Sequence, residues 1–396
     1  MKRELACELY YTMRYFLSSG SVLKWLEFPA IYRIPADELY ELDAAAFEFL
    51  GKCASQEGCE AEGYDREFIE YAVREGILTT RFTGGGERPF RKSPEPSLRY
   101  LELQITTGCN LRCRHCYIGP SRMTELTLET IGDILDEFQK MQGLRLLITG
   151  GEPLVHTKFR EINRLLPEYA FRKVLFTNGI LLSDELVESL NVNEIQVSID
   201  GIGEGHDSLR GKGTFQKAMT GLRKAAQAGH EVSVATMVHS LNLNDFEEMK
   251  ELFEGIGIKE WSVDVPSAVG NLRDNPLFRL PPEIGGKYLR YGFGDGLHGG
   301  GDEFACGLHL ATVMAEGRVA KCTFYRSSSV GNVAEGLEKC WKRIVPVRLE
   351  ELACDCTRKK ECRGGCRYRA ELLGNRLGRD LYRCVAYGQK ADSRLG

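Results

Sequence analysis

The sequence predicts an α/β fold for the middle of the chain, with a smaller block on either side. Two observations support this prediction. Six short apolar runs, several of them rich in β-branched residues, occupy residues 100–106, 144–150, 173–179, 194–200, 231–240 and 258–265. Helical patterns, with apolar residues three or four positions apart, lie between them at residues 127–141, 183–190, 214–229 and 244–257. Strands that alternate with helices indicate a parallel sheet built from βα units.

Two shifts in composition divide the 396 residues into three blocks, in line with the two or three domains expected at this length. Residues 84–98 are rich in Gly, Pro and charge and predict a linker after a first block at residues 1–83. A Gly-rich stretch near residue 295 separates the middle block, residues 99–295, from a cysteine-rich block at residues 296–396. The first block predicts a small α+β module, with strands over 23–34 and 38–43 and helices over 44–53 and 65–76.

Composition excludes several functional classes. Apolar residues make up 43% and charged residues 27% of the chain, as in ordinary globular proteins. A net charge of −4 gives no case for binding nucleic acid or a membrane surface. No apolar run approaches the length of about 18 residues that a membrane span needs. Glu4 and Glu8 interrupt the start of the chain, so we expect mature protein there rather than a signal peptide.

Fourteen cysteines are too unevenly placed for a disulfide framework, which belongs mostly to short secreted chains. Clusters at ligand-like spacing favour zinc or iron–sulfur sites instead. Such sites predict a reducing, cytoplasmic location. Cys7, Cys53 and Cys59 are scattered, and we expect them to be ordinary thiols.

Cys109, Cys113 and Cys116 form a C-x3-C-x2-C run directly after the first predicted strand of the middle block. Three thiolates on one loop can hold three corners of a cubane iron–sulfur cluster and leave the fourth iron open for a small molecule. The alternative is a zinc site in which His115 supplies the fourth ligand.

Further motifs follow the next three strands. The sequence GGEP ends the second, TNG the third and SIDG the fourth. Because the carboxyl ends of parallel strands meet at one edge of a sheet, we expect these motifs to converge with the cysteine loop. Glycines there allow a close backbone approach to a ligand. The residues concerned are Gly150, Gly151, Glu152, Pro153, Asn178, Ser198 and Asp200.

The cysteine run, followed by Tyr117 and placed after the first strand of a βα series, resembles the radical S-adenosylmethionine (SAM) superfamily. The resemblance implies a partial (β/α)6 TIM-like barrel at residues 99–295. It also implies a [4Fe–4S] cluster whose open iron binds SAM. An electron from the cluster then splits SAM, and the resulting 5′-deoxyadenosyl radical takes a hydrogen atom from the substrate. No side chain is assigned a catalytic role beyond the clusters.

The same resemblance implies which residues bind the cofactor. Glu152 is expected to pair with the SAM ammonium group, Ser198 and Asp200 to face the ribose and carboxylate, and Arg210 to bind a carboxylate. Residues 234–238 either line an adenine pocket or belong to the core, and Asn178 is either a ligand or a turn residue. The full predicted set is Tyr117, Gly150, Gly151, Glu152, Pro153, Asn178, Ser198, Asp200 and Arg210.

Seven cysteines of the last block resemble the SPASM extension of radical SAM peptide and protein maturases, which typically holds two auxiliary [4Fe–4S] clusters. With the SAM-binding cluster, this implies three clusters in all. A structural zinc site is the alternative. The family pattern assigns Cys306, Cys322 and Cys366 to one auxiliary cluster, and Cys354, Cys356, Cys362 and Cys384 to the other.

Three departures from the family pattern matter. Only Asp355 separates Cys354 from Cys356, where the family usually has two residues. No cysteine precedes Cys306 closely, so the first auxiliary cluster has an open iron, a non-cysteine ligand or Cys340, which we expect instead to be a buried thiol on a helix. Enzymes that mature sulfatases carry an aspartate where this chain has Thr323, which makes sulfatase maturation less favoured.

Residues 1–83 resemble the PqqD-like winged-helix domain, which binds the leader of a precursor peptide by adding it to a sheet edge. The strand near residues 39–42 is a candidate edge. The alternative is a plain capping domain.

Together these resemblances imply a radical SAM maturase of a ribosomally made peptide that forms a thioether or C–C crosslink. We lean towards a thioether, because an open iron on an auxiliary cluster would suit binding of a substrate thiolate. The expected partners are a precursor peptide with a leader and an external electron donor such as ferredoxin or flavodoxin. Two alternatives remain. One is a radical SAM enzyme that matures a folded enzyme or makes a small cofactor, and the other is a non-catalytic iron–sulfur or zinc protein.

Overall fold

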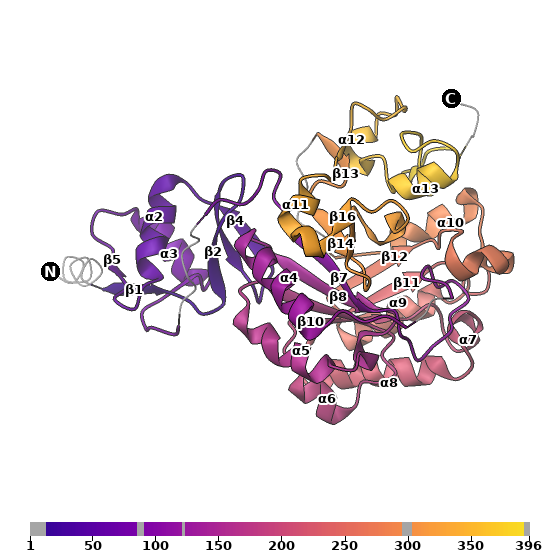
Figure 1. Ribbon diagram of the computed structural model, residues 1–396, viewed down its shortest axis with the longest axis horizontal. Coiled ribbons are helices and arrows are strands. Elements are labelled where there is room, and N and C mark those ends of the chain that lie inside the picture. Colours follow the sequence, from indigo (N-terminus) through magenta and orange to yellow (C-terminus); the bar gives the residue numbers. More distant parts are fainter. Residues whose placement is uncertain (1–12, 85–90, 121–122, 295–302, 392–396) are drawn as a thin grey trace. The chain divides into compact units, whose positions relative to one another are not determined.

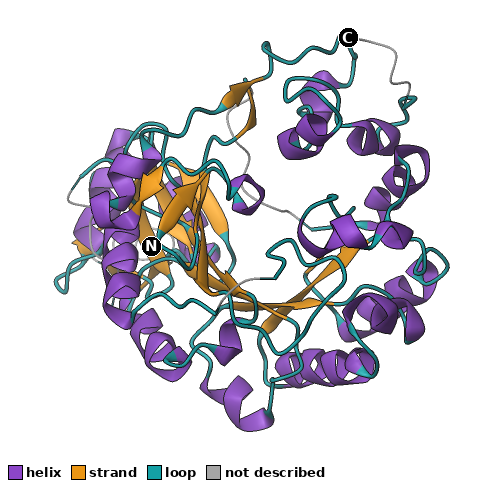
Figure 2. Cartoon of the chain, turned by 45° about the vertical axis from the view of Figure 1, so that its right-hand side comes forward, coloured by secondary structure: helices purple, strands orange, loops and turns teal. Residues whose placement is uncertain are grey.

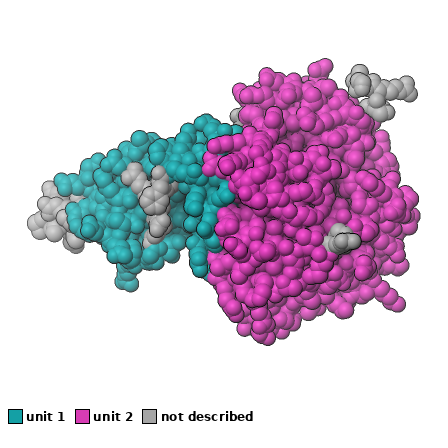
Figure 3. Space-filling view, viewed as in Figure 1, with its two compact units in different colours: residues 1–99, 135–145, 167–172 teal, residues 100–134, 146–166, 173–396 magenta. Residues whose placement is uncertain are grey.

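The computed structural model describes residues 13–84, 91–120, 123–294 and 303–391. It contains two compact units (Figure 3). Unit 1 consists of residues 1–99, 135–145 and 167–172, and unit 2 of residues 100–134, 146–166 and 173–396. Cys7 and residues 85–90 of the predicted linker lie outside the described residues, so the predictions made for them are not tested. The domain boundaries at residues 83, 98 and 295 stay predictions.

Unit 1 contains two small antiparallel sheets, with strand orders β5-β1-β6 and β2-β3-β4. The predicted helices and the predicted strand over 38–43 are confirmed, but the single strand predicted over 23–34 is two antiparallel strands, β2 and β3. Strands β1, β5 and β6 were not anticipated. The elements are β1 (Arg14–Leu17), β2 (Ser21–Trp25), β3 (Pro29–Arg33), β4 (Glu38–Glu41), α2 (Ala44–Cys53), β5 (Cys59–Glu60), α3 (Arg66–Arg74) and β6 (Leu78–Thr79).

Helices α2 and α3 each follow a capping aspartate. The side chain of Asp43 accepts a hydrogen bond of 2.7 Å from the backbone of Ala46, and Asp65 accepts one of 2.8 Å from Glu67. Such caps satisfy backbone N–H groups that have no partner within the helix. The apolar faces of the helices, including the fully buried Phe49, then form one core with the strands.

Unit 2 is built on one nine-stranded sheet with the order β12-β11-β10-β9-β8-β7-β14-β15-β16. The strands β9 to β12 pair in parallel, and β14 pairs in parallel with β7. The strands are β7 (Tyr100–Thr106), β8 (Arg145–Gly150), β9 (Arg172–Thr177), β10 (Glu194–Ser198), β11 (Glu231–Met237), β12 (Glu260–Asp264), β14 (Leu310–Val313), β15 (Arg318–Ala320) and β16 (Gly331–Asn332).

All six predicted strands of the middle block are therefore confirmed, but the sheet does not stop with them. Strand β14, from the cysteine-rich block, lies beside β7 (Figure 1), and β15 and β16 extend the sheet further in antiparallel pairing. The turn that joins β14 to β15 contains Gly317, with a positive φ of 76° that favours glycine. The partial barrel stays a prediction beside this observed sheet.

Helices connect the strands and lie along the outer side of the row that the strands form (Figure 2). The four predicted helices are confirmed as α4, α6, α8 and α9, and α5, α7 and α10 are additional short helices. The bounds are α4 (Leu128–Lys140), α5 (Phe159–Leu165), α6 (Asp184–Ser189), α7 (Glu204–Arg210), α8 (Thr214–Gln227), α9 (Phe246–Ile256) and α10 (Pro282–Tyr288). No helix in the described ranges combines the length and apolar composition needed to cross a membrane.

Besides β14 to β16, the last block adds further short elements. These include β13 (Phe304–Cys306), which pairs with β17 (Val347–Arg348), and the helices α11 (Leu337–Trp341), α12 (Lys359–Cys362), α13 (Arg367–Leu372) and α14 (Leu381–Ala386). Cys340 is buried on α11, as expected, and its thiol donates to the carbonyl of Asn332 at 3.3 Å.

Candidate functional site

A cavity of about 680 Å³ opens among the carboxyl ends of the strands of unit 2. The predicted convergence of motifs is confirmed, because residues that follow four different strands line this one cavity. Of the predicted cofactor and metal residues, it is lined by Cys109, Cys113, Cys116, Tyr117, Gly150, Gly151, Asn178, Ser198, Asp200 and Arg210. Glu152 and Pro153 are buried and do not line the cavity.

The cysteine loop is held in place by Asn271, which sequence reasoning missed. The backbone N–H of Asn271 donates to the carbonyl of Cys116 at 3.0 Å, and its side-chain amide donates to the carbonyl of Cys113 at 2.9 Å. Gly270, with a φ of 52°, brings this backbone against the loop, where a Cβ would meet Tyr117. In the sequence, the Gly-Asn pair that follows the sixth strand was the feature that could have indicated this contact.

The glycines of the GGEP motif allow the second strand end to approach the cysteine loop. A Cβ on Gly151 would lie 2.7 Å from the carbonyl oxygen of Thr107 and closer still to that of Gly108. A Cβ on Gly150 would lie 2.8 Å from the carbonyl oxygen of Thr106. Any larger residue would therefore push the loop that begins at Gly108 out of place.

Glu152 joins the second strand end to the third. Its carboxylate accepts hydrogen bonds from the Thr177 hydroxyl at 2.8 Å, the Asn178 backbone at 2.7 Å and the Leu154 backbone at 3.2 Å. Burial raises the pKa of Glu152 to about 7, although these donors oppose the shift. Its pairing with a SAM ammonium group stays a prediction.

Asp200 and Arg210 form a buried ion pair on the cavity wall. Asp200 also accepts a hydrogen bond of 2.7 Å from the backbone of Met237. Burial alone would raise the pKa of Asp200, but the charge of Arg210 outweighs it and holds that pKa well below its usual range. The pair therefore stays ionised, and Arg210 carries a fixed positive charge at the cavity wall.

Residues 234–238 divide between the two roles that the sequence left open. Ala235 and Met237 line the cavity, whereas Val234, Thr236 and Val238 are buried. Alternation along strand β11 explains the division, because successive side chains point to opposite faces.

The donor set fits an iron–sulfur cluster. Burial raises the pKa of Cys109 to about 11 and also raises that of Cys113, so these thiols gain a proton unless a cation stabilises the thiolates. Among the described residues, no three His, Cys, Asp or Glu side chains converge on a single metal ion. A cubane spreads its thiolates over several irons, so its ligands need not meet at one point.

His115 lines the same cavity but is a poor proton carrier. Burial lowers its pKa to about 3, which keeps the imidazole neutral. Its Nδ1 atom is buried and has no hydrogen-bond partner in the part of the chain that the structure describes.

The seven cysteines of the last block fall into two groups. Four of them, Cys354, Cys356, Cys362 and Cys384, line one small cavity. The other three thiols influence one another: burial, together with the charges of the Cys306 and Cys366 thiolates, raises the pKa of Cys322 to about 12. These are the two groups that the family pattern assigned, and their roles as cluster ligands stay predictions. No described cysteine is disulfide-bonded.

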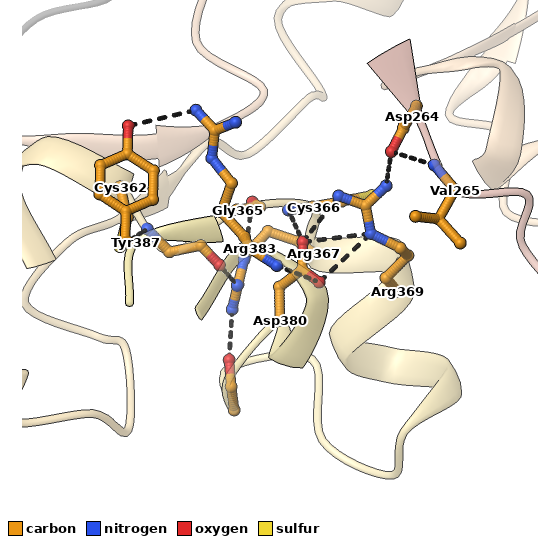
Figure 4. A network of polar contacts seen from close by, with 12 residues as sticks. Asp264, Val265, Cys362, Gly365, Cys366, Arg367, Arg369, Asp380, Arg383 and Tyr387 are labelled. Carbon is orange, nitrogen blue, oxygen red and sulfur yellow. Dashed lines mark hydrogen bonds and ion pairs between the residues drawn. The ribbon is translucent and has the colours of Figure 1, made fainter. Parts of the chain in front are cut away.

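Asp380 links the two groups (Figure 4). Its carboxylate accepts a hydrogen bond of 2.7 Å from the backbone of Cys366 and also caps α14, the helix that carries Cys384. Arg369 pairs with Asp380 at 2.8 Å and with Asp264 at the end of β12. The network thus ties both cysteine groups to the nine-stranded sheet, and nothing in the local sequence pattern indicated it.

Comparisons with known proteins agree with this geometry. Residues 103–253 match the radical SAM superfamily. An AdoMet-dependent heme synthase of Methanosarcina barkeri (strain Fusaro / DSM 804) is 34% identical over 187 residues, which are 44% of this chain and 53% of that protein. Mycofactocin maturase MftC of Mycobacterium ulcerans (strain Agy99) is 27% identical over 337 residues, or 74% of this chain and 89% of that one. The chain spans about half the length of the heme synthases it matches.

Among solved structures, Streptococcus suis SuiB bound to its precursor peptide SuiA has a TM-score of 0.66. The alignment covers 92% of this chain and 98% of SuiB at 13% identity, which shows a shared fold. The radical SAM domain that the family match identifies therefore lies at residues 103–253.

Proposed function

We propose that the protein modifies a ribosomally made precursor peptide by radical SAM chemistry. The observation that carries the proposal is the cavity of unit 2, where three cysteines of one loop meet polar residues from several strand ends. Cys109, Cys113 and Cys116 would hold a [4Fe–4S] cluster. When bound, this cluster and SAM supply a 5′-deoxyadenosyl radical that removes a hydrogen atom from the substrate.

The residues of the wall would position SAM against that loop. Gly150 and Gly151 offer backbone groups without a side chain in the way, and Arg210 supplies a fixed positive charge for a carboxylate. Tyr117, Asn178, Ser198 and Asp200 complete the proposed set from the lining residues, with Glu152 and Pro153 behind them.

The two cysteine groups of residues 296–396 would hold two auxiliary [4Fe–4S] clusters in a SPASM-type domain. These auxiliary clusters would accept the electron that the substrate radical releases when a thioether or C–C crosslink forms. An external donor of the ferredoxin or flavodoxin class would supply the electron that starts the reaction.

Three findings favour a peptide substrate. The SuiB structure holds a precursor peptide, and MftC is named a maturase. In unit 1, β4 is an outer strand of the sheet β2-β3-β4, and an outer strand offers backbone groups to which an extended peptide can pair. We therefore infer that residues 1–83 are a PqqD-like recognition domain that binds the leader.

The test uses the full-length protein, reconstituted with iron and sulfide under anaerobic conditions. It is incubated with SAM, dithionite and synthetic peptides encoded by the open reading frames that flank its gene. We expect 5′-deoxyadenosine and one peptide that has lost two hydrogen atoms. SAM cleavage with every peptide mass unchanged would overturn the peptide assignment, and no SAM cleavage would overturn the radical chemistry.

The similarity to heme synthases favours a second candidate, a radical SAM enzyme that acts on a small tetrapyrrole. The same incubation with iron coproporphyrin in place of the peptides separates the two. Product from the porphyrin alone would select the second candidate.

A further inference from the structure

Glu102 extends from the middle of the sheet into the cavity that holds the cysteine loop. It is the third residue of β7, and it lines the cavity together with Tyr117, Thr323 and Phe324. Thr323 and Phe324 belong to the turn that directly follows Cys322. Glu102 therefore faces the part of the wall that adjoins this cysteine of the last block.

The neighbouring strand holds the Glu102 carboxylate in position. Thr312 of β14 is the register partner of Glu102, and its hydroxyl donates to Oε2 at 2.7 Å. This contact exists because the last block adds β14 to the sheet beside β7. A side chain fixed in this way presents its carboxylate to the cavity in a defined orientation.

Glu102 differs from the other carboxylate that lines the cavity. Asp200 is ion-paired with Arg210, whereas Glu102 makes no ion pair in the described ranges. Arg326 influences Glu102 by its charge, but its guanidinium pairs with Glu316 at 3.8 Å. The Glu102 carboxylate is thus not committed to a cation.

Among the groups of the wall, Glu102 is the carboxylate that a hydroxyl holds in position and that no cation of the described residues pairs with. Burial raises the pKa of Glu102, although Thr312 and Thr323 oppose the shift. A carboxylate with a raised pKa is a stronger base than one in water.

We propose that Glu102 is a catalytic residue that accepts the proton lost by the substrate when the new bond forms. The proposal rests on the proposed function. In that reaction a C–H bond and an X–H bond of the peptide are broken, and a C–X bond forms, where X is sulfur or carbon. One hydrogen atom leaves to the 5′-deoxyadenosyl group, one proton goes to Glu102, and one electron goes to an acceptor of the iron–sulfur class. The two hydrogens lost by the peptide are then accounted for.

The experiment compares Glu102→Gln with wild type on the flanking-frame peptide that wild type modifies, deuterated at the attacked carbon. The readouts are crosslinked peptide, 5′-deoxyadenosine and deuterium in the 5′-deoxyadenosine. We expect the ratio of crosslinked peptide to 5′-deoxyadenosine to fall about 100-fold, in the range typical for loss of a general base. Deuterium should still reach the 5′-deoxyadenosine, because hydrogen abstraction precedes the proton transfer.

Two further variants separate chemistry from folding. Glu102→Asp keeps a carboxylate and should restore part of the coupling. Glu231→Gln makes the same chemical change on strand β11 outside the cavity and should keep the wild-type ratio. Iron content and the effect of SAM on the cluster's electron paramagnetic resonance (EPR) spectrum should match wild type in all three variants.

The outcomes are distinct. If Glu102→Gln keeps the wild-type ratio of product to 5′-deoxyadenosine, Glu102 is not the proton acceptor, while the proposed function stands. A parallel fall in product and deuterium transfer would assign Glu102 a structural role instead. If wild type modifies no peptide, the proposed function fails and this assignment fails with it.

Discussion

Several polar side chains in and behind the cavity wall of unit 2 have partners within the protein. Glu152 accepts three hydrogen bonds, Asp200 pairs with Arg210, and the side-chain amide of Asn178 donates to Asn110 at 2.7 Å. A buried polar group without a partner costs stability, so these contacts fix each side chain in one orientation. The wall is therefore ordered by its own residues.

Glu152 predicts a pH dependence of stability. Its pKa is about 7 in the folded protein, against an ordinary value of 4.5. Between these two values the folded state binds a proton that the unfolded state does not, so stability falls as pH rises through this window. The slope is at most about 1.4 kcal/mol per pH unit for one proton. Above pH 7 both states are ionised and the contribution is constant.

The measurement is the melting temperature of the anaerobic holoprotein, without SAM, between pH 5 and pH 8. Glu152→Gln cannot ionise, so the variant should gain stability relative to wild type as the pH rises. The comparison with the variant cancels His115 and His206, whose lowered pKa values act in the opposite direction over part of this range. Parallel curves for the two proteins would contradict the prediction.

At this scale the sequence predicts residues that belong to local motifs. Cys109, Cys113 and Cys116 were predictable because the three ligands lie within eight consecutive residues of one loop, so their spacing can be read from the sequence. Asn271 and Glu102 were not, because their importance comes from contacts with residues more than 150 positions away. A polar residue in a strand such as β7, which also holds Gln104 and Thr106, gives no signal of the cavity it faces.

At the scale of elements, periodicity predicted the six strands and four of the helices of the middle block. The short helices α5 and α7 were missed, because seven residues span only about two turns and give a weak periodic pattern. Length alone did not decide the outcome, since the predicted α6 has six residues. The pairing of β14 with β7 was also missed. It joins strands about 210 positions apart, and apolar patterns do not state which strands pair.

The network around Asp380 predicts that one carboxylate supports both cysteine groups of the last block. Asp380→Ala removes a partner of the buried Arg369, which costs about 3–5 kcal/mol when a buried pair is broken. It also removes the cap of α14, worth about 1 kcal/mol. We expect a lower melting temperature and loss of iron from both auxiliary sites, measured as iron per chain and by EPR.

Asp380→Asn is the matched variant, because it keeps an acceptor for the Cys366 backbone but not the charge. It should retain more iron than Asp380→Ala. Asp184→Asn, at the exposed start of α6, should behave as wild type. A normal iron content in Asp380→Ala would show that the cysteine loops hold their positions without this carboxylate.

At the scale of the whole molecule, the chain carries three separate cysteine groups within unit 2. Cys109, Cys113 and Cys116 line the large cavity, four cysteines line the small one, and three lie together around Cys322. The sequence predicted this grouping only through the family pattern, since spacing alone does not say which distant cysteines meet. Separate groups predict clusters that load independently of one another.

Iron content tests this independence. Three cubane clusters predict about twelve irons per chain. Replacement of Cys109, Cys113 and Cys116 together by Ala should leave about eight irons and abolish SAM cleavage, because the group that would bind SAM is gone. Cys354→Ala combined with Cys356→Ala should also leave about eight irons, but SAM cleavage should persist because the loop after β7 is unchanged. Loss of SAM cleavage in both variants, or an iron content well below eight in either, would show that the three groups do not form separate clusters.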